Sequence, residues 1–315
     1  MPDIIQLLPD SIANQIAAGE VIQRPASVIK ELLENAVDAG ATQIKLIIKD
    51  AGKTSIQVID DGKGMSETDA RMAFERHATS KIKSANDLFC IKTMGFRGEA
   101  LASIAAIAHV ELTTRQAHED TATKIQMEGS MLTKQEKVQA MPGTNITVKN
   151  LFYNVPARRK FLKSDPVELK HIMDEFHRVS LANTDIFFTL HHNGNEVYHL
   201  PKSNLKQRIL GVMGKQMNEK LIPINQETEA AAFSGFIGKP DTAKKTQGEQ
   251  FIFVNKRFIK SNYLNHAIRA AYEDLLPKDM YTPYFLFLEI DPATIDINVH
   301  PTKTEIKFED ERLIY

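Results

Sequence analysis

Residues 30–41 read KELLENAVDAGA and predict an amphipathic helix. At about 100° per residue, Glu31, Asn35 and Asp38 fall within about 60° of one another. The opposite arc is apolar and consists of Val28, Ile29, Leu32, Leu33, Ala36 and Val37. Such a helix packs its apolar face on a core. Its polar face is either a solvated surface or part of a ligand site, and this pattern alone leaves both readings open.

The neighbouring residues set the ends of this helix and predict two strands after it. Pro25 suits a first-turn position and Gly40 suits the position after the last turn. Next come two alternating runs, QIKLIIKD (43–50) and TSIQVIDD (54–61). Alternation with period two predicts a β-hairpin or two neighbouring strands. Upstream, Pro9 to Ser11 predict the start of a short helix that ends near Val21.

Length and composition limit the class of protein. A chain of 315 residues with 43% hydrophobic residues predicts two globular domains. The net charge of −1 gives no overall attraction to nucleic acid or membrane, so any such binding needs a local basic patch. The single cysteine, Cys90, excludes an internal disulfide. With no signal-peptide pattern and no apolar run of membrane-spanning length, we expect a protein of the cytoplasm, in association with the nucleoid, or of the nucleus.

The rest of the chain predicts an α+β architecture. Segments 108–150 and 184–200 alternate as strands, and a helix is expected over 165–183. The first domain is therefore predicted as a mixed, largely antiparallel sheet covered by helices on one side. Residues 201–220 carry the crossing to a smaller α/β domain. That domain has strands at 231–238, 250–259, 284–290 and 295–299, and a helix at 262–276.

Four further pieces could hold a nucleotide. In QVIDDGKGM (57–65), Asp60 ends a strand and can accept a hydrogen bond from an exocyclic amine, while the glycines allow a close backbone approach. In RHATSKI (76–82), Arg76, His77 and Lys81 surround two hydroxyl residues. An Asp-Asp-Gly turn and a charged helix end are the plain alternatives for these two pieces.

The third piece is GFRGEALASI (95–104), which places two glycines directly before a helix, an arrangement suited to anions. The fourth is DINVHPTKTEIKF (296–308), with Lys303 in a turn after a strand. A lysine in a turn is ordinarily solvated.

In this order, these pieces and the Gly143-Thr144 pair resemble the GHKL ATPase superfamily. Longer runs narrow the resemblance. NQIAAGEVIQRPASVIKELLENAVDAGA, RHATSKI, GFRGEALASI, LFYNVPARRKFL and NVHPTKTEIKF are similar to the MutL family of DNA mismatch repair proteins. The resemblance covers nearly all of residues 4–310. It implies a two-layer GHKL (Bergerat-type) ATPase domain over 1–205, and a ribosomal-protein-S5-like transducer domain over 206–315.

The resemblance also implies roles for individual residues. Glu31 matches the general base for water, and Asn35 matches the ligand of Mg²⁺. Lys303 matches a lysine that the second domain sends to the γ-phosphate when the domains close. Asp60 would bind the adenine amine, and Glu99 would be structural. The full ATP-binding set is Asn35, Asp38, Ala39, Asp60, Gly64, Thr79, Ser80, Gly95, Phe96, Arg97, Gly98 and Thr144.

By the same resemblance we expect a slow, Mg²⁺-dependent ATPase that acts as a switch in DNA mismatch repair. ATP would order segment 1–20 and bring two copies of the chain together. A MutS-type mismatch-recognition protein and downstream repair proteins are the implied partners, with no membrane role. Two basic groups would bind double- or single-stranded DNA non-specifically. They are Arg158, Arg159, Lys160 and Lys163 in one group, and Lys256, Arg257, Lys260 and Arg269 in the other.

Three other classes share part of this pattern. A topoisomerase-type GHKL protein is the nearest enzyme, but LFYNVPARRKFL and the HPTK turn resemble MutL more closely. A histidine kinase would need a phospho-acceptor helix, and no obvious one is present. A clamp that binds nucleotide without hydrolysing it is the non-enzymatic alternative, against which Glu31, Asn35 and Lys303 argue. Because family members continue past this point, we expect the chain to be an N-terminal fragment.

Overall fold

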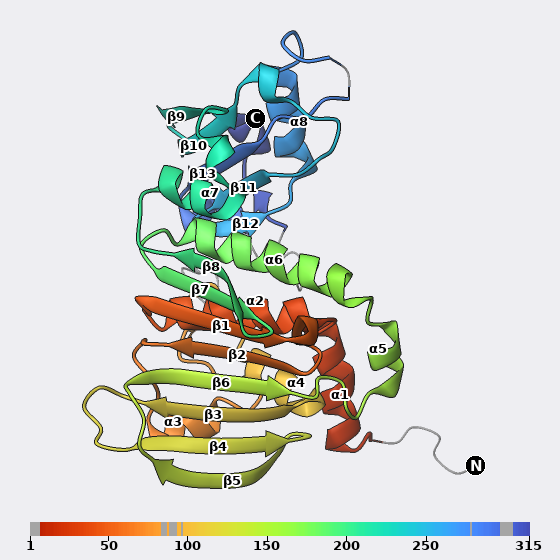
Figure 1. Cartoon of the computed structure of the whole chain (residues 1–315), viewed down its shortest axis with the longest axis vertical. Coiled ribbons are helices and arrows are strands. Elements are labelled where there is room, and N and C mark those ends of the chain that lie inside the picture. Colours follow the sequence, from red (N-terminus) through yellow and green to blue (C-terminus); the bar gives the residue numbers. More distant parts are fainter. Residues whose placement is uncertain (1–6, 83–86, 88–92, 96, 278, 297–304) are drawn as a thin grey trace. The chain divides into compact units, whose positions relative to one another are not determined.

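The computed structural model describes residues 7–82, 87, 93–95, 97–277, 279–296 and 305–315 (Figure 1). The chain divides into two compact units. Unit 1 contains residues 1–82, 93–176 and 186–201, and unit 2 contains 83–92, 177–185 and 202–315. The sequence placed a boundary at 205. In the structure unit 2 also takes the end of a long helix, a division that the sequence did not predict.

An eight-stranded sheet forms the base of unit 1, in the order β5-β4-β3-β6-β2-β1-β7-β8. Strands β1 and β7 run parallel, and the other neighbouring pairs that the structure describes are antiparallel. The predicted hairpin is confirmed as β1 and β2, with a 3₁₀ turn, Asp50–Gly52, between them. The strands are β1 Gln43–Lys49, β2 Ser55–Asp60, β3 His109–Arg115, β4 Ala122–Glu128, β5 Met131–Val138, β6 Gly143–Lys149, β7 Phe187–His192 and β8 Asn195–Leu200.

Helices cover one face of this sheet, as predicted. In Figure 1, α1, α2 and α4 lie behind the strands. Strand residues that point to this side, such as Ile44, Leu46 and Ile48, are buried, whereas Gln43 and Lys45 are exposed on the opposite side. We call these sides the helix face and the open face. The helices of this part of the chain are α1 Asp10–Val21, α2 Pro25–Asp38, α3 Glu67–Met72, α4 Ala100–Ile107, α5 Pro156–Phe161 and α6 Asp165–Ala182.

The amphipathic pattern of α2 is confirmed. Pro25 stands in its first turn, and its apolar arc is buried except for the half-buried Val37, with Val28, Ile29 and Leu33 fully inaccessible. Gly40 follows the helix at φ +73° with open space around it, so glycine is needed there for the backbone conformation. Helix α1 begins one residue earlier than expected, at Asp10, with Pro9 as its N-cap residue and no side-chain cap. Because the apolar arc of α2 packs on the core, the polar stripe of Glu31, Asn35 and Asp38 lies on the other side of the helix and is half-buried.

Unit 2 contains a five-stranded sheet in the order β12-β11-β13-β10-β9, in which only the pair β11·β13 is parallel among the pairs described. A two-stranded sheet, β14·β15, accompanies it. The bounds are β9 Leu221–Glu227, β10 Ala232–Gly238, β11 Gln250–Val254, β12 Arg257–Ile259, β13 Tyr284–Glu289, β14 Ile295–Asp296, β15 Lys307–Phe308, α7 Leu205–Met213, α8 Asn262–Ala271 and α9 Glu311–Ile314, with 3₁₀ turns at Lys215–Met217, Pro240–Thr242 and Pro292–Thr294.

The sequence missed strand β9 and the fully buried Arg208. β9 is an exposed edge strand that carries Pro223, so it shows neither strong alternation nor a run of strand-forming residues. The Arg208 guanidinium donates to the carbonyls of Ser180 (2.7 Å), Asn183 and Thr184 at the end of α6. Burial lowers the pKa of Arg208 to about 10. None of the helices in the described part of the chain is long and apolar enough to cross a membrane.

Candidate active site

The polar stripe of α2 lies on the helix face of unit 1. Lys30 contacts both Glu34 (3.1 Å) and Glu31 (3.5 Å) within the same helix. Burial by itself lowers the pKa of Lys30, but the carboxylates of Glu34 and Glu31 outweigh burial and raise that pKa above its usual value. This buried ion pair was not predicted from the sequence, although the four-residue spacing of Lys30 and Glu34 was the available signal. The pair fixes the part of α2 that carries Glu31.

Two adjacent carboxylates at the end of β2 have different environments. Asp61 accepts hydrogen bonds from the Thr42 and Gln43 amides (2.7 and 2.8 Å) and from the Thr42 hydroxyl. Asp60 points to the helix face, where the Gly62 amide donates to its Oδ1 (2.9 Å). Burial raises the pKa of Asp60 to about 6, and hydrogen bonds from the Gly62 and Thr144 amides only partly offset it. Asp61 therefore anchors the start of β1, and Asp60 is the carboxylate placed for a ligand.

Glycines bring backbone segments close together around Asp60. A Cβ on Gly143 would lie 2.1 Å from the Asp60 carbonyl oxygen, and one on Gly64 would lie 2.0 Å from the Arg115 carbonyl oxygen. Both glycines have positive φ. A Cβ on Gly62 would lie 2.8 Å from the Ala39 Cβ, next to the end of α2. These glycines let neighbouring backbone segments pack closely around Asp60, and we call Gly62, Gly64 and Gly143 the glycine cradle.

Buried hydroxyls complete the wall of this cradle. The Thr144 hydroxyl lies 3.1 Å from that of Thr114, which also contacts the Gly143 carbonyl oxygen (3.1 Å) and accepts from the Met65 amide (3.0 Å). Thr144 was predicted as part of the site. Thr114 was missed because a threonine inside an alternating strand carries no signal of its own.

Two segments of the chain meet beside α2, and we call residues 76–82 and the described residues 93–95 and 97–99 the lid segments. A Cβ on Gly98 would lie 2.3 Å from the Ala78 carbonyl oxygen, so the two segments touch. His77 Nδ1 lies 3.4 Å from Glu99 Oε1. The Gly95 amide donates to Asp38 Oδ2 (3.0 Å), which ties one segment to the helix. The predicted phosphate-binding pieces are thus neighbours.

A cation already lies at the predicted metal ligand. The Lys81 ammonium is 3.1 Å from Asn35 Oδ1 and also pairs with Asp38. Within the described ranges, no three His, Cys, Asp or Glu side chains gather as a protein-only metal site would require. Mg²⁺ ordinarily takes few protein ligands and binds nucleotide phosphates as well. The oxygen pair on α2 therefore fits Mg²⁺ that arrives with a nucleotide.

The remaining predicted site residues have mixed outcomes. Ala39, Thr79, Ser80 and Arg97 lie in unit 1 with the lid segments or at the end of α2. Phe96 and Lys303 lie outside the described residues, as does Cys90.

Two of the arginines assigned to DNA are engaged elsewhere or buried. Arg158 Nη1 donates to the Gly19 and Ile22 carbonyls (2.9 and 3.0 Å) at the end of α1. Arg257 is only 7% exposed. Neither side chain is presented to a phosphate, so we remove both from the DNA-binding set. The exposed members are Arg159, Lys160 and Lys163 in unit 1, and Lys256, Lys260 and Arg269 in unit 2.

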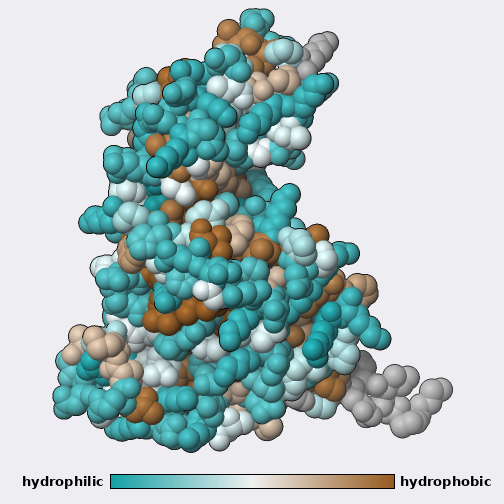
Figure 2. Space-filling model, viewed as in Figure 1, coloured by the Kyte–Doolittle hydropathy of each residue, from teal (hydrophilic) through white to brown (hydrophobic). Residues whose placement is uncertain are grey.

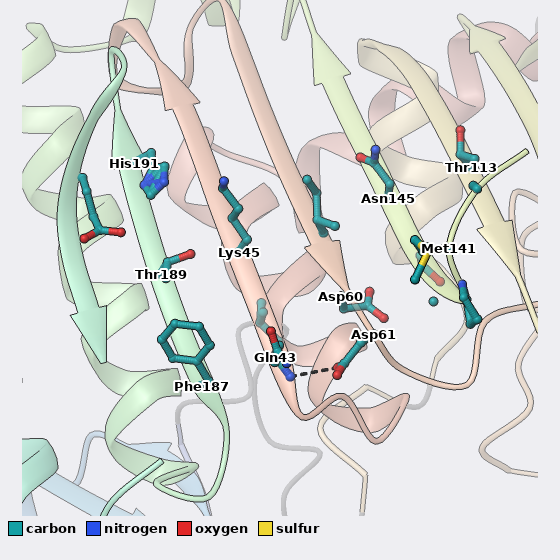
Figure 3. A pocket seen from close by; sticks show the side chains of 17 residues that line it. Gln43, Lys45, Asp60, Asp61, Thr113, Met141, Asn145, Phe187, Thr189 and His191 are labelled. Carbon is teal, nitrogen blue, oxygen red and sulfur yellow. Dashed lines mark hydrogen bonds between the residues drawn. The ribbon is translucent and has the colours of Figure 1, made fainter. Parts of the chain in front are cut away.

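A pocket of about 530 Å³ lies on the open face of the sheet (Figure 3). Its lining includes Lys45, Asn145, Thr189 and His191, which stand on the near side of the strands in Figure 3, with helices behind. The stripe residues of α2 are not part of this lining. Figure 2 shows the same face as mostly hydrophilic. Asp60, Gly143 and Thr144 of the cradle also belong to this lining, so the pocket adjoins the cradle.

Comparisons with known proteins agree with this geometry. Residues 23–154 match the family of histidine kinase-, DNA gyrase B- and HSP90-like ATPases. Residues 209–315 match the C-terminal domain of DNA mismatch repair proteins. The chain is 64% identical over all its 315 residues to the DNA mismatch repair protein MutL of Christiangramia forsetii. It is 62% identical to that of Flavobacterium johnsoniae. It spans about half the length of these relatives (51% and 49%).

Solved structures give the same result. The MutL ATPase domain of Aquifex aeolicus complexed with ADP is 28% identical, with a TM-score of 0.67 over 86% of this chain and 94% of that one. The N-terminal domain of a DNA repair protein is 25% identical, with a TM-score of 0.83 over 96% of this chain and 94% of that one. With matches along its whole length and the GHKL arrangement of helices on a mixed sheet, this chain belongs to the MutL family of DNA mismatch repair proteins and contains the GHKL-type ATPase domain of that family.

Proposed function

We propose that the chain binds Mg²⁺-ATP on the helix face of unit 1 and hydrolyses it slowly, as a dimerisation switch in mismatch repair. The observation that carries this proposal is the placement of Asp60, the glycine cradle, the α2 stripe and the lid segments beside one another in one unit. The ADP complex of the Aquifex aeolicus relative supports nucleotide binding.

The adenine would lie in the glycine cradle. Asp60 would accept a hydrogen bond from its exocyclic amine, and Thr144 would line the same wall, with Gly64 allowing the approach. The phosphates would then extend toward α2 and the lid segments, where the amides of Gly95 and Gly98 precede helix α4. Asn35 and Asp38 lie along this path.

Hydrolysis needs a positioned base and charge stabilisation at the γ-phosphate. Glu31 would orient and deprotonate the attacking water, a role worth about 10²–10⁴-fold. Lys30, 3.5 Å from Glu31 Oε1, would fix the position of that carboxylate. Mg²⁺ held by Asn35 would neutralise phosphate charge when bound. Lys303, supplied by the predicted transducer domain, would contribute a second positive charge.

The N-terminal helix offers a surface for a second copy of the chain. Leu8, Ile12 and Ile16 recur at a spacing of four residues and are 51%, 44% and 54% exposed. Ile12 and Ile16 lie on one side of α1, and Leu8 lies just before this helix, which begins at Asp10. An exposed apolar stripe at the part of the chain that ATP is expected to order suits a nucleotide-dependent homodimer.

DNA and a MutS-type protein complete the proposed function, which would operate in the cytoplasm at the nucleoid. The two exposed basic groups would neutralise DNA phosphates without reading sequence. Co-sedimentation with a MutS-type protein on mismatched DNA tests the partner, and equal recovery on fully paired DNA would count against it.

Phosphate release from Mg²⁺-ATP is the experiment that tests hydrolysis. We expect slow release whose rate per chain rises with protein concentration, and loss of at least about 100-fold in Glu31→Ala with nucleotide still bound. Glu196→Ala, an exposed glutamate on β8, is the matched control and should be unaffected. If wild type and Glu31→Ala hydrolyse ATP equally while binding it, Glu31 is not the base.

A further inference from the structure

The inference concerns the ammonium group of Lys81. Its Nζ lies 3.1 Å from Asn35 Oδ1 and forms an ion pair with Asp38 Oδ2. The side chains of Lys81 and Asp38 are 20% and 6% exposed, so this pair is largely removed from water. The contact joins a lid segment to α2 across 43 residues of sequence.

Asp38 is the centre of a small network. Besides Lys81, its two carboxylate oxygens accept from the amides of Met94 (2.9 Å) and Gly95 (3.0 Å). A Cβ on Gly95 would lie 3.0 Å from Lys81 Nζ, so glycine at this position leaves room for the ammonium. A charge-assisted hydrogen bond and two backbone donors satisfy a carboxylate that would otherwise be costly to bury. The negative charge of Asp38 is therefore compensated by protein groups, without a metal ion.

The same oxygen atoms define the proposed metal position. Mg²⁺ binds oxygen ligands at about 2.0–2.1 Å. An ion at that distance from Asn35 Oδ1 would lie close to an ammonium that is 3.1 Å from the same oxygen. Two cations at such a separation repel each other strongly where little water screens them. Asn35 can thus hold the ammonium or the metal ion, but not both.

We propose that Lys81 is a built-in counter-cation that holds the Asn35–Asp38 position and competes with Mg²⁺ for it. This inference rests on the proposed function, in which Asn35 holds the metal ion. Competition makes the free chain a poor binder of Mg²⁺. Metal loading also displaces the Lys81 side chain from Asn35 and Asp38, and with it the contact between this lid segment and α2. Lys81 is a positioning residue that links metal occupancy to the lid.

Binding of Mn²⁺ to the nucleotide-free chain, followed by the loss of the free-ion EPR signal, tests the competition. Lys81→Met removes the charge and keeps much of the side-chain length. We expect Lys81→Met to bind Mn²⁺ at least about tenfold more tightly than wild type, because a unit positive charge beside the ion is gone. Adding Asp38→Asn to Lys81→Met should abolish the gain. Lys45→Met, on the open face of the same sheet, is the matched control and should bind Mn²⁺ as wild type does.

Thermal unfolding gives a second measurement that does not depend on nucleotide. Without its partner, Asp38 is a buried charge, so Lys81→Met should unfold at a lower temperature than wild type. Mn²⁺ should restore much of that loss in Lys81→Met and change wild type little. Lys81→Arg keeps the charge and should behave as wild type in both measurements.

Equal Mn²⁺ affinity in wild type and Lys81→Met would overturn the inference, as would a gain that persists after Asp38→Asn. Nucleotide binding by wild type is measured separately. If ATP binds but the Mn²⁺ affinities are equal, the counter-cation role alone fails. If the competition is seen but ATP does not bind, the proposed function fails and the cation exchange at Asp38 stands.

Discussion

Asp60 and Asp61 show how adjacent, chemically identical residues acquire different tasks. Three hydrogen-bond donors from Thr42 and Gln43 outweigh the effect of burial and lower the pKa of Asp61. Burial with fewer donors raises the pKa of Asp60 to about 6. A carboxylate that is kept ionised against the preference of its environment is typical of a functional site. The fold therefore carries a destabilising group at the position where the ligand is proposed to bind.

This difference predicts the effect of pH on stability. A carboxyl whose folded-state pKa lies above its unfolded value loses stability as pH rises from about 4 to about 6. Asp60→Asn removes that loss, so at pH 8 the variant should be more stable than wild type by about 1–3 kcal/mol. Below about pH 4 the difference should vanish. Urea unfolding at pH 4, 6 and 8 measures it. A variant that is less stable than wild type at pH 8 would contradict the environment we assign to Asp60.

At the residue scale, the sequence predicted candidate site residues but could not show which of their side chains are engaged in contacts within the fold. It treated Arg158 and Arg159 alike, because both are basic residues of one short segment. In the structure Arg158 donates to two carbonyls at the end of α1, while Arg159 is exposed. Contacts between positions 139 residues apart leave no trace in a local pattern. Lys81 is a similar case, since only the fold shows that its ammonium reaches Asn35.

At the scale of elements, periodic patterns predicted α2, the β1–β2 hairpin, α4 and α6, and the structure confirms them. Three of them have an amphipathic or alternating pattern, whereas α4 is a short apolar run, and each has a proline or glycine near an end. Helix α5 and strand β9 were not predicted. α5 is six residues long and has no buried residue, so no apolar period marks it. Burial is slight in α5 and β9, but helix α7, which buries Ile209 and Val212, was also missed because its residues were assigned to the crossing between the domains.

The cradle predicts a strong effect from adding one methyl group. Gly64→Ala would put a Cβ 2.0 Å from the Arg115 carbonyl oxygen at a positive φ, and we expect a loss of about 3 kcal/mol or more in the free energy of unfolding. Gly194→Ala is the control, because Gly194 also has positive φ but open space around it. There the cost should be about 1 kcal/mol. Equal losses in the two variants, measured by urea unfolding, would show that the close approach at Gly64 does not matter.

Helix α1 carries a second prediction at this scale. Ile16→Asp places a charge on the exposed apolar stripe, so nucleotide-dependent dimerisation should weaken by about tenfold or more while the monomer stays folded. Val197→Asp, on β8 at the edge of the sheet, starts from a similar exposure of 44% and should dimerise normally. Sedimentation velocity with a non-hydrolysable ATP analogue measures both. A dimer that is insensitive to Ile16→Asp would place the interface elsewhere.

At the scale of the whole molecule, the distribution of charged residues matters more for DNA binding than the net charge does. The net charge is −1, yet α5 and its end present Arg159, Lys160 and Lys163 without a neighbouring acid in that run. Binding of DNA should therefore fall steeply with salt concentration. The chain divides into two units, each with its own sheet.

Charge reversal tests this DNA surface. The double variant Arg159→Glu, Lys160→Glu should bind duplex DNA more weakly. The slope of log affinity against log salt concentration should become shallower by about 2, because two phosphate contacts are lost. Lys137→Glu, an exposed lysine on β5, provides the control. Fluorescence anisotropy over a range of salt concentrations gives both quantities. An unchanged salt dependence in the double variant would remove α5 from the DNA surface.

The most direct test of the central claim is a calorimetric titration of the chain and its Asp60→Asn variant with a non-hydrolysable analogue of ATP, and with the GTP analogue. A carboxylate beside the nucleobase accepts a hydrogen bond from the exocyclic amine of adenine. In guanine a carbonyl oxygen takes the place of that amine, so the carboxylate would face a second acceptor and no bond would form. We predict one ATP site per chain and at least about tenfold weaker binding of GTP to wild type, with that preference lost in Asp60→Asn. Equal binding of the two nucleotides by wild type, or an undiminished ATP preference in Asp60→Asn, would contradict the placement of adenine beside Asp60.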